Sequence, residues 1–451
     1  MKNFKLVGRF NNTLNVNAEN NFEIIEVPLV NNNGVLNYGL GKVYKKLIEN
    51  NNIPKEDALD ILLLATLVYL ADTRISRELH SQDSWTREIK LDIPVYNSKT
   101  FSKAIPVFEK MLCFLTGDKW TISISNREAF ITEEKDESIK ENSIDVVTLF
   151  SGGMDSLIST INYLEQKKNV MLVSHAGEGF TKNAQTNIIS KFKNEYPDIE
   201  ILYLDLWMVF DQNFIKDGGN ENSTRSRSFL FIALGIFAIS ALDNVNTLQV
   251  PENGLIALNI PLDELRIGSH STRTTHPFYL NCWNELLKIL DLDILVVNPY
   301  WNKTKGEMAD ECINKEFLKL TMSQSFSCSS PSKVKWKGLP PPQHCGYCVP
   351  CIIRRAAMNK AFGINGDDTT YTSISMKELI NGHANSEGIQ LRSFQYAIKR
   401  IKENPSIVDL LIYKTGPIKG SNEYINNLAD VYKRGLLEVD EFIECSLKEG
   451  V

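Results

Sequence analysis

The segment from residue 151 to residue 156, with the sequence SGGMDS, contains the residue types of a phosphate-binding loop. Gly152 and Gly153 allow the backbone to turn sharply, so that its N–H groups and the N-terminus of a following helix can point at a pyrophosphate. Ser151 and Ser156 can donate hydroxyl hydrogen bonds to phosphate oxygens, and Asp155 can hold Mg²⁺. The Gly-Lys-Ser/Thr ending of a Walker A loop is absent, and a plain turn with a serine as helix N-cap is the alternative interpretation. The predicted cofactor-binding residues of this loop are Ser151, Gly152, Gly153, Met154, Asp155 and Ser156.

A cluster of cysteines forms the second chemical signal. Cys345, Cys348 and Cys351 stand at two-residue intervals, and Cys328 lies a short way upstream. Thiolates with this spacing fit the corners of one tetrahedron, so we expect a closed, structural site for Zn²⁺ made by all four. Replacement of one ligand by His344, or an iron–sulfur cluster, are alternatives. The remaining cysteines, which we expect in the core, are Cys113, Cys282, Cys312 and Cys445.

Polar loops that follow strand-like segments could contribute further side chains. The segment PENG at residues 251–254 follows a strand-like stretch, and a Ser/Thr/Arg/His-rich stretch covers residues 268–277. Loops at the carboxyl ends of strands in open α/β sheets are where ligands bind. Arg273 is the candidate for bidentate binding of a phosphate or carboxylate. His276 could act as an acid or base, although a histidine before proline in a turn is more often structural.

The elements that must position these residues follow from the hydrophobic pattern. From residue 145 onward, the apolar runs VVTLF, VMLVSHA, ILYLDLW and DILVVNP alternate with helical segments, which is typical of a mostly parallel sheet covered on both faces. Before it, residues 61–70 indicate an apolar helix, residues 85–95 a half-buried strand, and the charged residues 133–141 a linker or solvated helix. We therefore expect an N-terminal α+β accessory domain over residues 1–140, an α/β domain over 141–365 and a helical C-terminal region over 366–451.

The composition of the chain argues against several classes of protein. The chain has 451 residues, 43% of them hydrophobic, and a formal net charge of −6, which argues against coating nucleic acid by bulk electrostatics. The longest apolar run, residues 229–242, is shorter than the roughly twenty residues needed to span a bilayer. The N-terminal residues show no secretory signal. We expect a cytoplasmic globular protein without membrane contact.

The motifs together resemble a known superfamily. SGGMDS is similar to the signature of the N-type ATP pyrophosphatases, the PP-loop superfamily, whose members cleave ATP between the α and β phosphates and form adenylates. The run CGYCVPCIIRR at residues 345–355 and TKGEM at 304–308 resemble the QueC family of 7-cyano-7-deazaguanine synthases. The resemblance covers about residues 145–365. It implies the adenine-nucleotide alpha hydrolase-like (HUP) fold, with ATP and Mg²⁺ as cofactors. It also implies that Lys305 binds an ATP phosphate and that Arg227 lies in the site. The alternative for Lys305 is a lysine exposed at a helix start.

The chain also departs from QueC. The family's deazaguanine-binding segment is replaced by residues 268–277, and both ends of the chain are additional. In its overall pattern the sequence is most similar to the QatC family, the QueC-like components of bacterial Qat anti-phage defence systems. This resemblance implies an ATPase, a small companion protein and a TatD-like nuclease as partners, and it leaves contact with nucleic acid open.

These observations predict an ATP-dependent enzyme that adenylates a carboxylate or amide oxygen, releases pyrophosphate and allows nitrogen transfer, in 7-deazaguanine-type chemistry within defence. Asp155, Lys305 and Arg273 are the predicted catalytic residues. A biosynthetic 7-cyano-7-deazaguanine synthase and an ATP-binding sensor or scaffold without catalysis are the alternatives.

Overall fold

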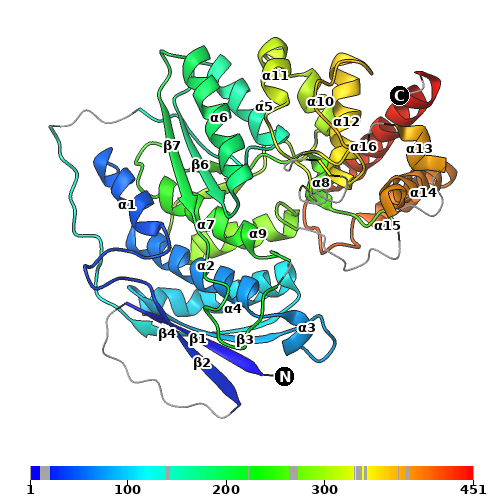
Figure 1. Cartoon of the computed structure of the whole chain (residues 1–451). Helices are drawn as coiled ribbons and strands as arrows, with labels where there is room; N and C mark the ends of the chain where they lie inside the picture. Colours follow the sequence, from blue (N-terminus) through cyan, green and yellow to red (C-terminus); the bar gives the residue numbers. More distant parts are fainter. Residues whose placement is uncertain are drawn as a thin grey trace.

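A computed structural model shows two parallel sheets separated by helices, with further helices at the C-terminal end (Figure 1). The residues that the structure describes are 2–10, 21–138, 143–221, 223–263, 273–329, 331, 338–339, 343–373, 375–381 and 386–449. Within these ranges no helix is long and apolar enough to cross a membrane.

The first sheet is built from the N-terminal part of the chain. All its strand pairs are parallel, in the order β2-β1-β3-β4, so the predicted α+β class is wrong for this part, which is α/β. The alternation in residues 85–95 indicates a strand but carries no information about the direction of its neighbours. The elements of this N-terminal part are β1 (Asn3–Arg9), β2 (Phe22–Pro28), α1 (Leu40–Glu49), α2 (Glu56–Arg74), α3 (Arg77–His80), β3 (Glu88–Val95), α4 (Ser98–Thr116) and β4 (Lys119–Asn126).

The second sheet is also parallel, with the order β7-β6-β5-β8-β9. The chain moves outward from β5 in one direction to β6 and β7 and in the other to β8 and β9, so the strand order reverses beside β5. Ligands of open α/β sheets bind in the crevice at such a point, outside the carboxyl ends of the strands. The strands are β5 (Val146–Leu149), β6 (Val170–Ala176), β7 (Ile201–Trp207), β8 (Thr247–Gln249) and β9 (Leu295–Val297).

Helices cover both faces of the second sheet. One face carries α5 (Met154–Glu165) and α6 (Gly179–Glu195), and the other carries α7 (Arg227–Ile239) and α9 (Pro277–Ile289). Helix α7 is apolar on every side: of its residues, only Arg227 and Phe231 are not buried. Such a helix needs covering all round.

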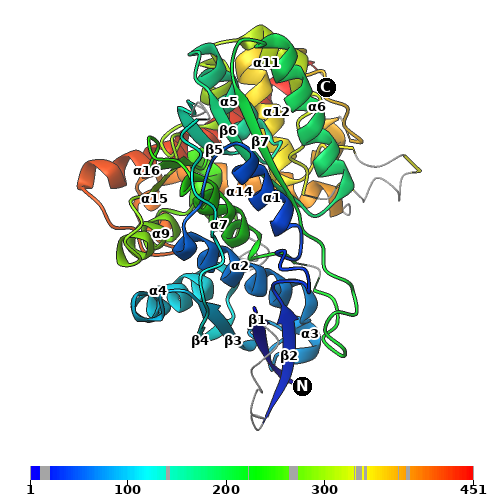
Figure 2. The ribbon, with the colours of Figure 1, turned by 90° about the vertical axis from the view of Figure 1, so that its left-hand side faces the viewer.

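The two sheets share one hydrophobic core. Helices α2 and α4 pack on α7 and α9 respectively, and they lie between the two sheets in both views (Figures 1 and 2). Side chains from β1, β3, α2, α4, α7, α9 and β5 form a single continuous cluster. The N-terminal region is therefore a layer of the same molecule, joined to the second sheet through the packing of α2 on α7 and of α4 on α9.

The C-terminal helices form a second core beside the carboxyl ends of the strands. The long helix α16 (Asn422–Glu449) packs on α8 (Gly254–Leu258), on α12 (Val349–Phe362) and on α10 (Lys305–Asp310). This confirms the predicted helical C-terminal region. The remaining helices are α11 (Lys315–Met322), α13 (Met376–Asn381), α14 (Ile389–Glu403) and α15 (Val408–Leu411).

Candidate functional site

The SGGMDS loop connects the end of β5 to the start of α5. Gly152 has φ +80, and a Cβ atom there would lie 3.0 Å from Cγ of Gln185, so glycine is required. Gln185 donates to the carbonyl of Ser151 at 3.1 Å. The hydroxyls of Ser151 and Ser156 lie 3.2 Å apart, and Ser156 also donates to the carbonyl of Gly153. The loop is thus held in one conformation, with its serines at the N-terminal end of a twelve-residue helix.

Asp155, in the last part of this segment, meets Lys305, which stands far from it in the sequence. The Lys305 ammonium lies 2.9 Å from Oδ1 of Asp155, and both side chains are buried. Asn253 donates to Oδ2 of Asp155 from its backbone N–H at 3.0 Å and from its amide at 2.8 Å. Burial raises the pKa of Asp155, but the charge of Lys305 and these hydrogen bonds outweigh burial and leave that pKa below its usual value. The alternative of an exposed lysine is wrong, because Lys305 is enclosed.

Lys305 is placed by the start of α10. It is the first residue of that helix and follows Thr304, which forms a capping box with Glu307. The hydroxyl of Thr304 accepts from the Glu307 backbone N–H, while the Glu307 carboxylate accepts from the Thr304 backbone N–H. The motif TKGEM therefore fixes the position from which Lys305 reaches Asp155.

Glu252 lies in the PENG loop, which the sequence marked as a possible ligand-binding loop without giving this carboxylate a role of its own. Its carboxyl group contacts that of Asp155, and it lines the cavity above. Burial and the neighbouring negative charge of Asp155 raise the pKa of Glu252 well above its usual value. The sequence feature that points to Glu252 is its position directly after the strand-like residues 247–250, at the same edge of the sheet as the glycine loop.

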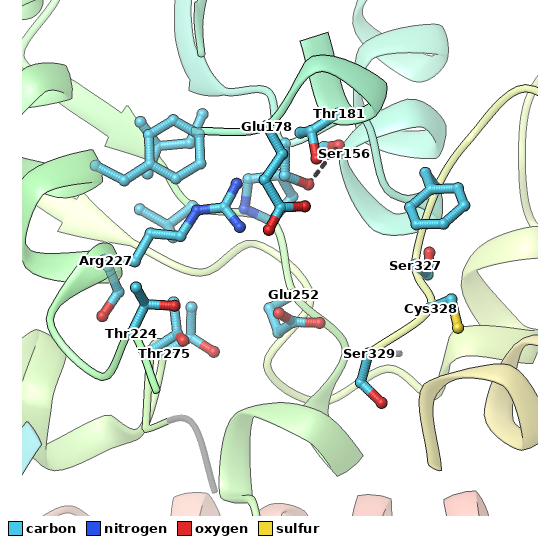
Figure 3. A pocket seen from close by; sticks show the side chains of 18 of the residues that line it. Ser156, Glu178, Thr181, Thr224, Arg227, Glu252, Thr275, Ser327, Cys328 and Ser329 are labelled. Atoms are coloured by element: carbon cyan, nitrogen blue, oxygen red, sulfur yellow. Dashed lines mark hydrogen bonds between the residues drawn. The ribbon is translucent and has the colours of Figure 1, made fainter. Parts of the chain in front are cut away.

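A cavity of about 630 Å³, within the size range of small-molecule sites, lies beside the Asp155–Lys305 pair (Figure 3). Ser151, Ser156 and Glu252 line it, whereas the buried side chains of Asp155 and Lys305 are not among its lining residues. Arg227, at the start of α7, and Glu178, directly before α6, point their charged groups into it, with Glu252 below them. Arg227 also donates to the carbonyl of His175 at 3.4 Å. Arg227 thus lies in the same cavity as Ser151 and Ser156, as the family resemblance implies. Lining residues include Ser151, Ser156, Glu178, Thr181, Thr224, Arg225, Arg227, Ser228, Glu252, Thr275, Phe326, Ser327 and Cys328.

Arg273 is not brought to this cavity, although the adjoining Thr274 and Thr275 line it. Its guanidinium donates to the carbonyl of Phe114 on α4 at 2.7 Å and lies over the Phe114 ring. His276 caps α9 by accepting from the Phe278 N–H, which agrees with the structural interpretation. Burial and the charge of Arg273 lower the pKa of His276 to about 3. Of the Ser/Thr/Arg/His-rich stretch, residues 268–272 lie outside the described part of the chain.

The four predicted cysteines form a closed, buried cluster. All four Sγ atoms lie within 4.8 Å of one another, with 3.9 Å between Cys328 and Cys348 and between Cys345 and Cys351. Four thiolates bound tetrahedrally to zinc at about 2.3 Å stand roughly 3.8 Å apart, so the residues fit this ion. The backbone turn after Cys345 uses Gly346 at φ +84, where a Cβ would strike the carbonyl of Ser373. The cluster is thus positioned to bind a metal ion, consistent with zinc.

His344 and the cysteines outside this cluster differ in where they lie. His344 accepts a hydrogen bond from the Ser327 N–H at 3.4 Å and packs on Phe326, so it is placed as a neighbour of the cluster. Cys282 and Cys312 are buried as expected. Cys113 is exposed, which contradicts its predicted place in the core, because it stands on the outer side of α4.

The cysteine cluster and the glycine loop are joined through the backbone. The N–H of Phe326 donates to the carbonyl of Gly152 at 2.8 Å, two residues before Cys328. Ser327 and Cys328 then continue along the cavity wall. A metal ion that holds Cys328 in place therefore also holds one side of the cavity.

The arrangement combines a glycine loop at a helix N-terminus, a buried carboxylate–ammonium pair and a wall carrying arginine. No protein-family model and no curated protein sequence matches this chain. The chemistry is therefore inferred from the site itself, which offers N–H and cationic groups for phosphates and carboxyl oxygens for a divalent cation.

Proposed function

We propose that this protein is an ATP-dependent, QueC-like enzyme that adenylates a carboxylate or amide oxygen, releases pyrophosphate and transfers nitrogen to the activated group. The observation that carries the proposal is the Asp155–Lys305 pair. Its aspartate belongs to the glycine loop at the carboxyl end of the central strand β5, and the pair lies beside a cavity large enough for a nucleotide.

The loop and its neighbours account for the first chemical step. The acceptor oxygen attacks the α-phosphorus of ATP, the bond between that phosphorus and the oxygen bridging to the β-phosphate breaks, and pyrophosphate leaves. The N–H groups of the loop, the N-terminus of α5 and the Lys305 ammonium stabilise the negative charge on the departing group. Arg227 neutralises a further phosphate oxygen from the opposite wall.

Asp155 would hold Mg²⁺ in place of one of its present contacts to Lys305 and Asn253, and Glu252, Ser151 and Ser156, which line the adjoining cavity, would offer further oxygen atoms, the donor type that this ion prefers. The bound ion would neutralise phosphate charge. In the second step an amine nitrogen attacks the acyl carbon, the bond to AMP breaks, and the nitrogen loses a proton. The nitrogen donor is ammonia or an amine on a partner.

The biological setting that we propose is 7-deazaguanine-type modification within bacterial anti-phage defence, in the cytoplasm, with an ATPase, a companion protein and a TatD-like nuclease as partners. Its support is the sequence resemblance to the QatC family. The four-cysteine cluster, with its three cysteines at two-residue intervals, is consistent with that resemblance.

The test is release of pyrophosphate and AMP from purified, zinc-loaded protein with Mg-ATP, with and without 7-carboxy-7-deazaguanine and ammonia. We expect release that Asp155→Ala abolishes and that Asp145→Ala, an exposed aspartate at the opposite end of β5, leaves intact. Release that depends on 7-carboxy-7-deazaguanine and ammonia would favour a 7-cyano-7-deazaguanine synthase. ATP binding without release under all conditions would contradict the enzymatic proposal and favour a scaffold.

A further inference from the structure

One wall of the cavity is formed by residues 223–228, with the sequence STRSRS, which we name the arginine segment. It lies between β7 and α7 and contributes Thr224, Arg225, Arg227 and Ser228 to the lining. Its two arginines are the only arginines among the described residues that line the cavity. The position of this short segment therefore determines where positive charge meets an anionic ligand on this side.

The arginine segment has three anchoring contacts to the N-terminal layer, besides the 3.4 Å hydrogen bond from Arg227 to the His175 carbonyl on β6. Oδ2 of Asp72, on α2, accepts from the Ser226 N–H at 2.7 Å. Arg77, on α3, donates to the Ser223 hydroxyl at 2.9 Å. Arg225 donates to the carbonyl of Thr116 at 2.8 Å and lies over the ring of Trp85.

Behind these contacts lies a buried cluster of two acids and two arginines, which we name the ion cluster: Asp72, Arg77, Arg87 and Asp118. Oδ1 of Asp72 accepts from Arg77 at 2.9 Å and from Arg87 at 2.8 Å. Oδ2 of Asp118 accepts from the same two guanidiniums at 2.7 and 2.6 Å. The four side chains are at most 4% exposed. Oδ1 of Asp72 is thus bound by the two arginines of the ion cluster, and Oδ2 binds the backbone of the arginine segment.

A buried ion cluster is weak evidence for stability, because desolvation of the charges offsets their attraction. Its geometry, however, is fixed by several charge-assisted hydrogen bonds, including a bidentate pair between Arg87 and Asp118. Oδ2 of Asp72 is therefore a rigidly held acceptor for the N–H of Ser226, the residue directly before Arg227 and the start of α7. A hydrogen bond there sets both the helix start and the direction of the arginine side chain.

We propose that the ion cluster positions the arginine segment for binding the phosphates of the nucleotide, so that the N-terminal layer is part of the ATP site. Asp72 acts as a positioning residue, through Ser226, on Arg227, whose guanidinium points into the cavity, whereas the guanidinium of Arg225 binds the Thr116 carbonyl and the Trp85 ring. This inference rests on the proposed function, since it takes the anionic ligand of the cavity to be ATP.

The experiment measures the affinity of α,β-methylene-ATP with Mg²⁺ for the full, zinc-loaded chain by titration calorimetry. Asp72→Asn is compared with Asp60→Asn, a matched control on the same helix. Asp60 is also buried and paired with an arginine, Arg127, at 2.7 Å, but its second oxygen accepts from the N–H of Tyr96, away from the cavity. We expect Asp72→Asn to weaken binding about tenfold or more, and Asp60→Asn to leave it within about twofold.

A second pair of variants leaves all four members of the ion cluster in place. Ser226→Pro removes the N–H that Asp72 accepts, at a backbone φ of −85 that is near the range of proline. Ser226→Ala keeps that N–H and removes only a hydroxyl that has no hydrogen-bond partner. We expect Ser226→Pro to reproduce the loss of affinity and Ser226→Ala to bind as the wild type does.

The possible outcomes separate the two proposals. If the wild type does not bind α,β-methylene-ATP, both the proposed function and this inference are wrong. If the wild type binds and Ser226→Pro binds equally well, the inference alone is overturned. Equal loss in Asp72→Asn and Asp60→Asn, with Ser226→Pro unaffected, would show a general effect of destabilising the N-terminal layer and would also overturn it.

Discussion

Glu438, near the C-terminal end of the chain, accepts a hydrogen bond of 2.8 Å from the backbone N–H of Gly306, the residue after Lys305. The same carboxylate accepts from the Thr304 hydroxyl. A Cβ at Gly306 would lie 2.4 Å from the Glu438 carboxyl carbon, so the two residues are in close contact. The last helix of the chain therefore holds the helix start from which Lys305 reaches Asp155.

Replacement of Glu438 should impair the reaction through Lys305. Glu438→Ala leaves the buried Gly306 N–H without its acceptor, at a cost of about 1–3 kcal/mol, and loosens the start of α10. We expect pyrophosphate release to slow about tenfold in kcat, with Glu438→Gln intermediate because its amide oxygen can still accept. Steady-state kinetics check this, with Glu441→Ala, an exposed residue of the same helix, as the control. An unchanged kcat in Glu438→Ala would refute the link.

The two glycines of the SGGMDS loop should respond differently to alanine. Gly152→Ala places a side chain at φ +80 and close to Gln185, so we expect a loss of about 1–2 kcal/mol in the free energy of unfolding. Gly153 has φ −84, which alanine adopts freely, but its methyl would lie 3.3 Å from the Ser151 hydroxyl and 3.5 Å from that of Ser327. Gly153→Ala should therefore fold normally and bind ATP more weakly.

Urea unfolding and calorimetric titration with α,β-methylene-ATP separate these two effects. The prediction fails if Gly153→Ala destabilises the fold as much as Gly152→Ala does.

Removal of the metal ion should affect nucleotide binding as well as local structure. We expect one zinc ion per chain by elemental analysis. Extraction with a chelator should release Cys328 and, with it, the Phe326 N–H that binds the glycine loop. Pyrophosphate release should fall by at least about tenfold and return when zinc is restored. Cys328→Ser should reproduce the loss, whereas Cys445→Ser, outside the cluster, should not. Full activity of the metal-free protein would contradict this coupling.

The ion cluster should make the fold sensitive to acid. Burial raises the pKa of Asp72, but Arg87, Arg77 and the Ser226 N–H outweigh it and lower that pKa from the usual 3.8. As the pH falls, the unfolded chain binds a proton at Asp72 before the folded chain does. The contribution of Asp72 is therefore complete above about pH 4 and is lost as the pH falls further.

This dependence is checked by urea unfolding of the wild type and Asp72→Asn between pH 3 and pH 7. At neutral pH the variant should be less stable by about 3 kcal/mol. The difference should shrink below about pH 4. A constant difference across this range would show that the charge of Asp72 does not contribute.

Local patterns predicted much of the fold. Residues 170–176 and 201–207 form strands with the bounds of the apolar runs, and residues 61–70 lie within the long helix α2. The cysteine spacing predicted the cluster positioned to bind a metal ion, because thiols with two residues between them, as in Cys345, Cys348 and Cys351, can reach one centre within a single turn of the chain, and Cys328 joins them from a nearby segment.

The contacts between distant segments could not be predicted in this way. Nothing near Glu252 in the sequence shows that its carboxyl group meets Asp155. Arg273 stood in a polar loop at a strand end, and only the packing of that loop on Phe114 shows that it is directed away from the cavity. The anchoring of the arginine segment on Asp72 joins residues 154 positions apart, which no local periodicity records.

The shared core of the two sheets has a consequence for how the chain is made. Helix α2 leaves the ribosome about 170 residues before α7, the apolar helix that covers it. At ordinary rates of synthesis this interval is on the order of ten to thirty seconds, much longer than a hydrophobic chain needs to collapse. During this time the unfinished N-terminal layer exposes one side of α2 that has no partner. Expression should therefore depend on chaperones that hold nascent chains, and a gene truncated before residue 227 should yield aggregated protein.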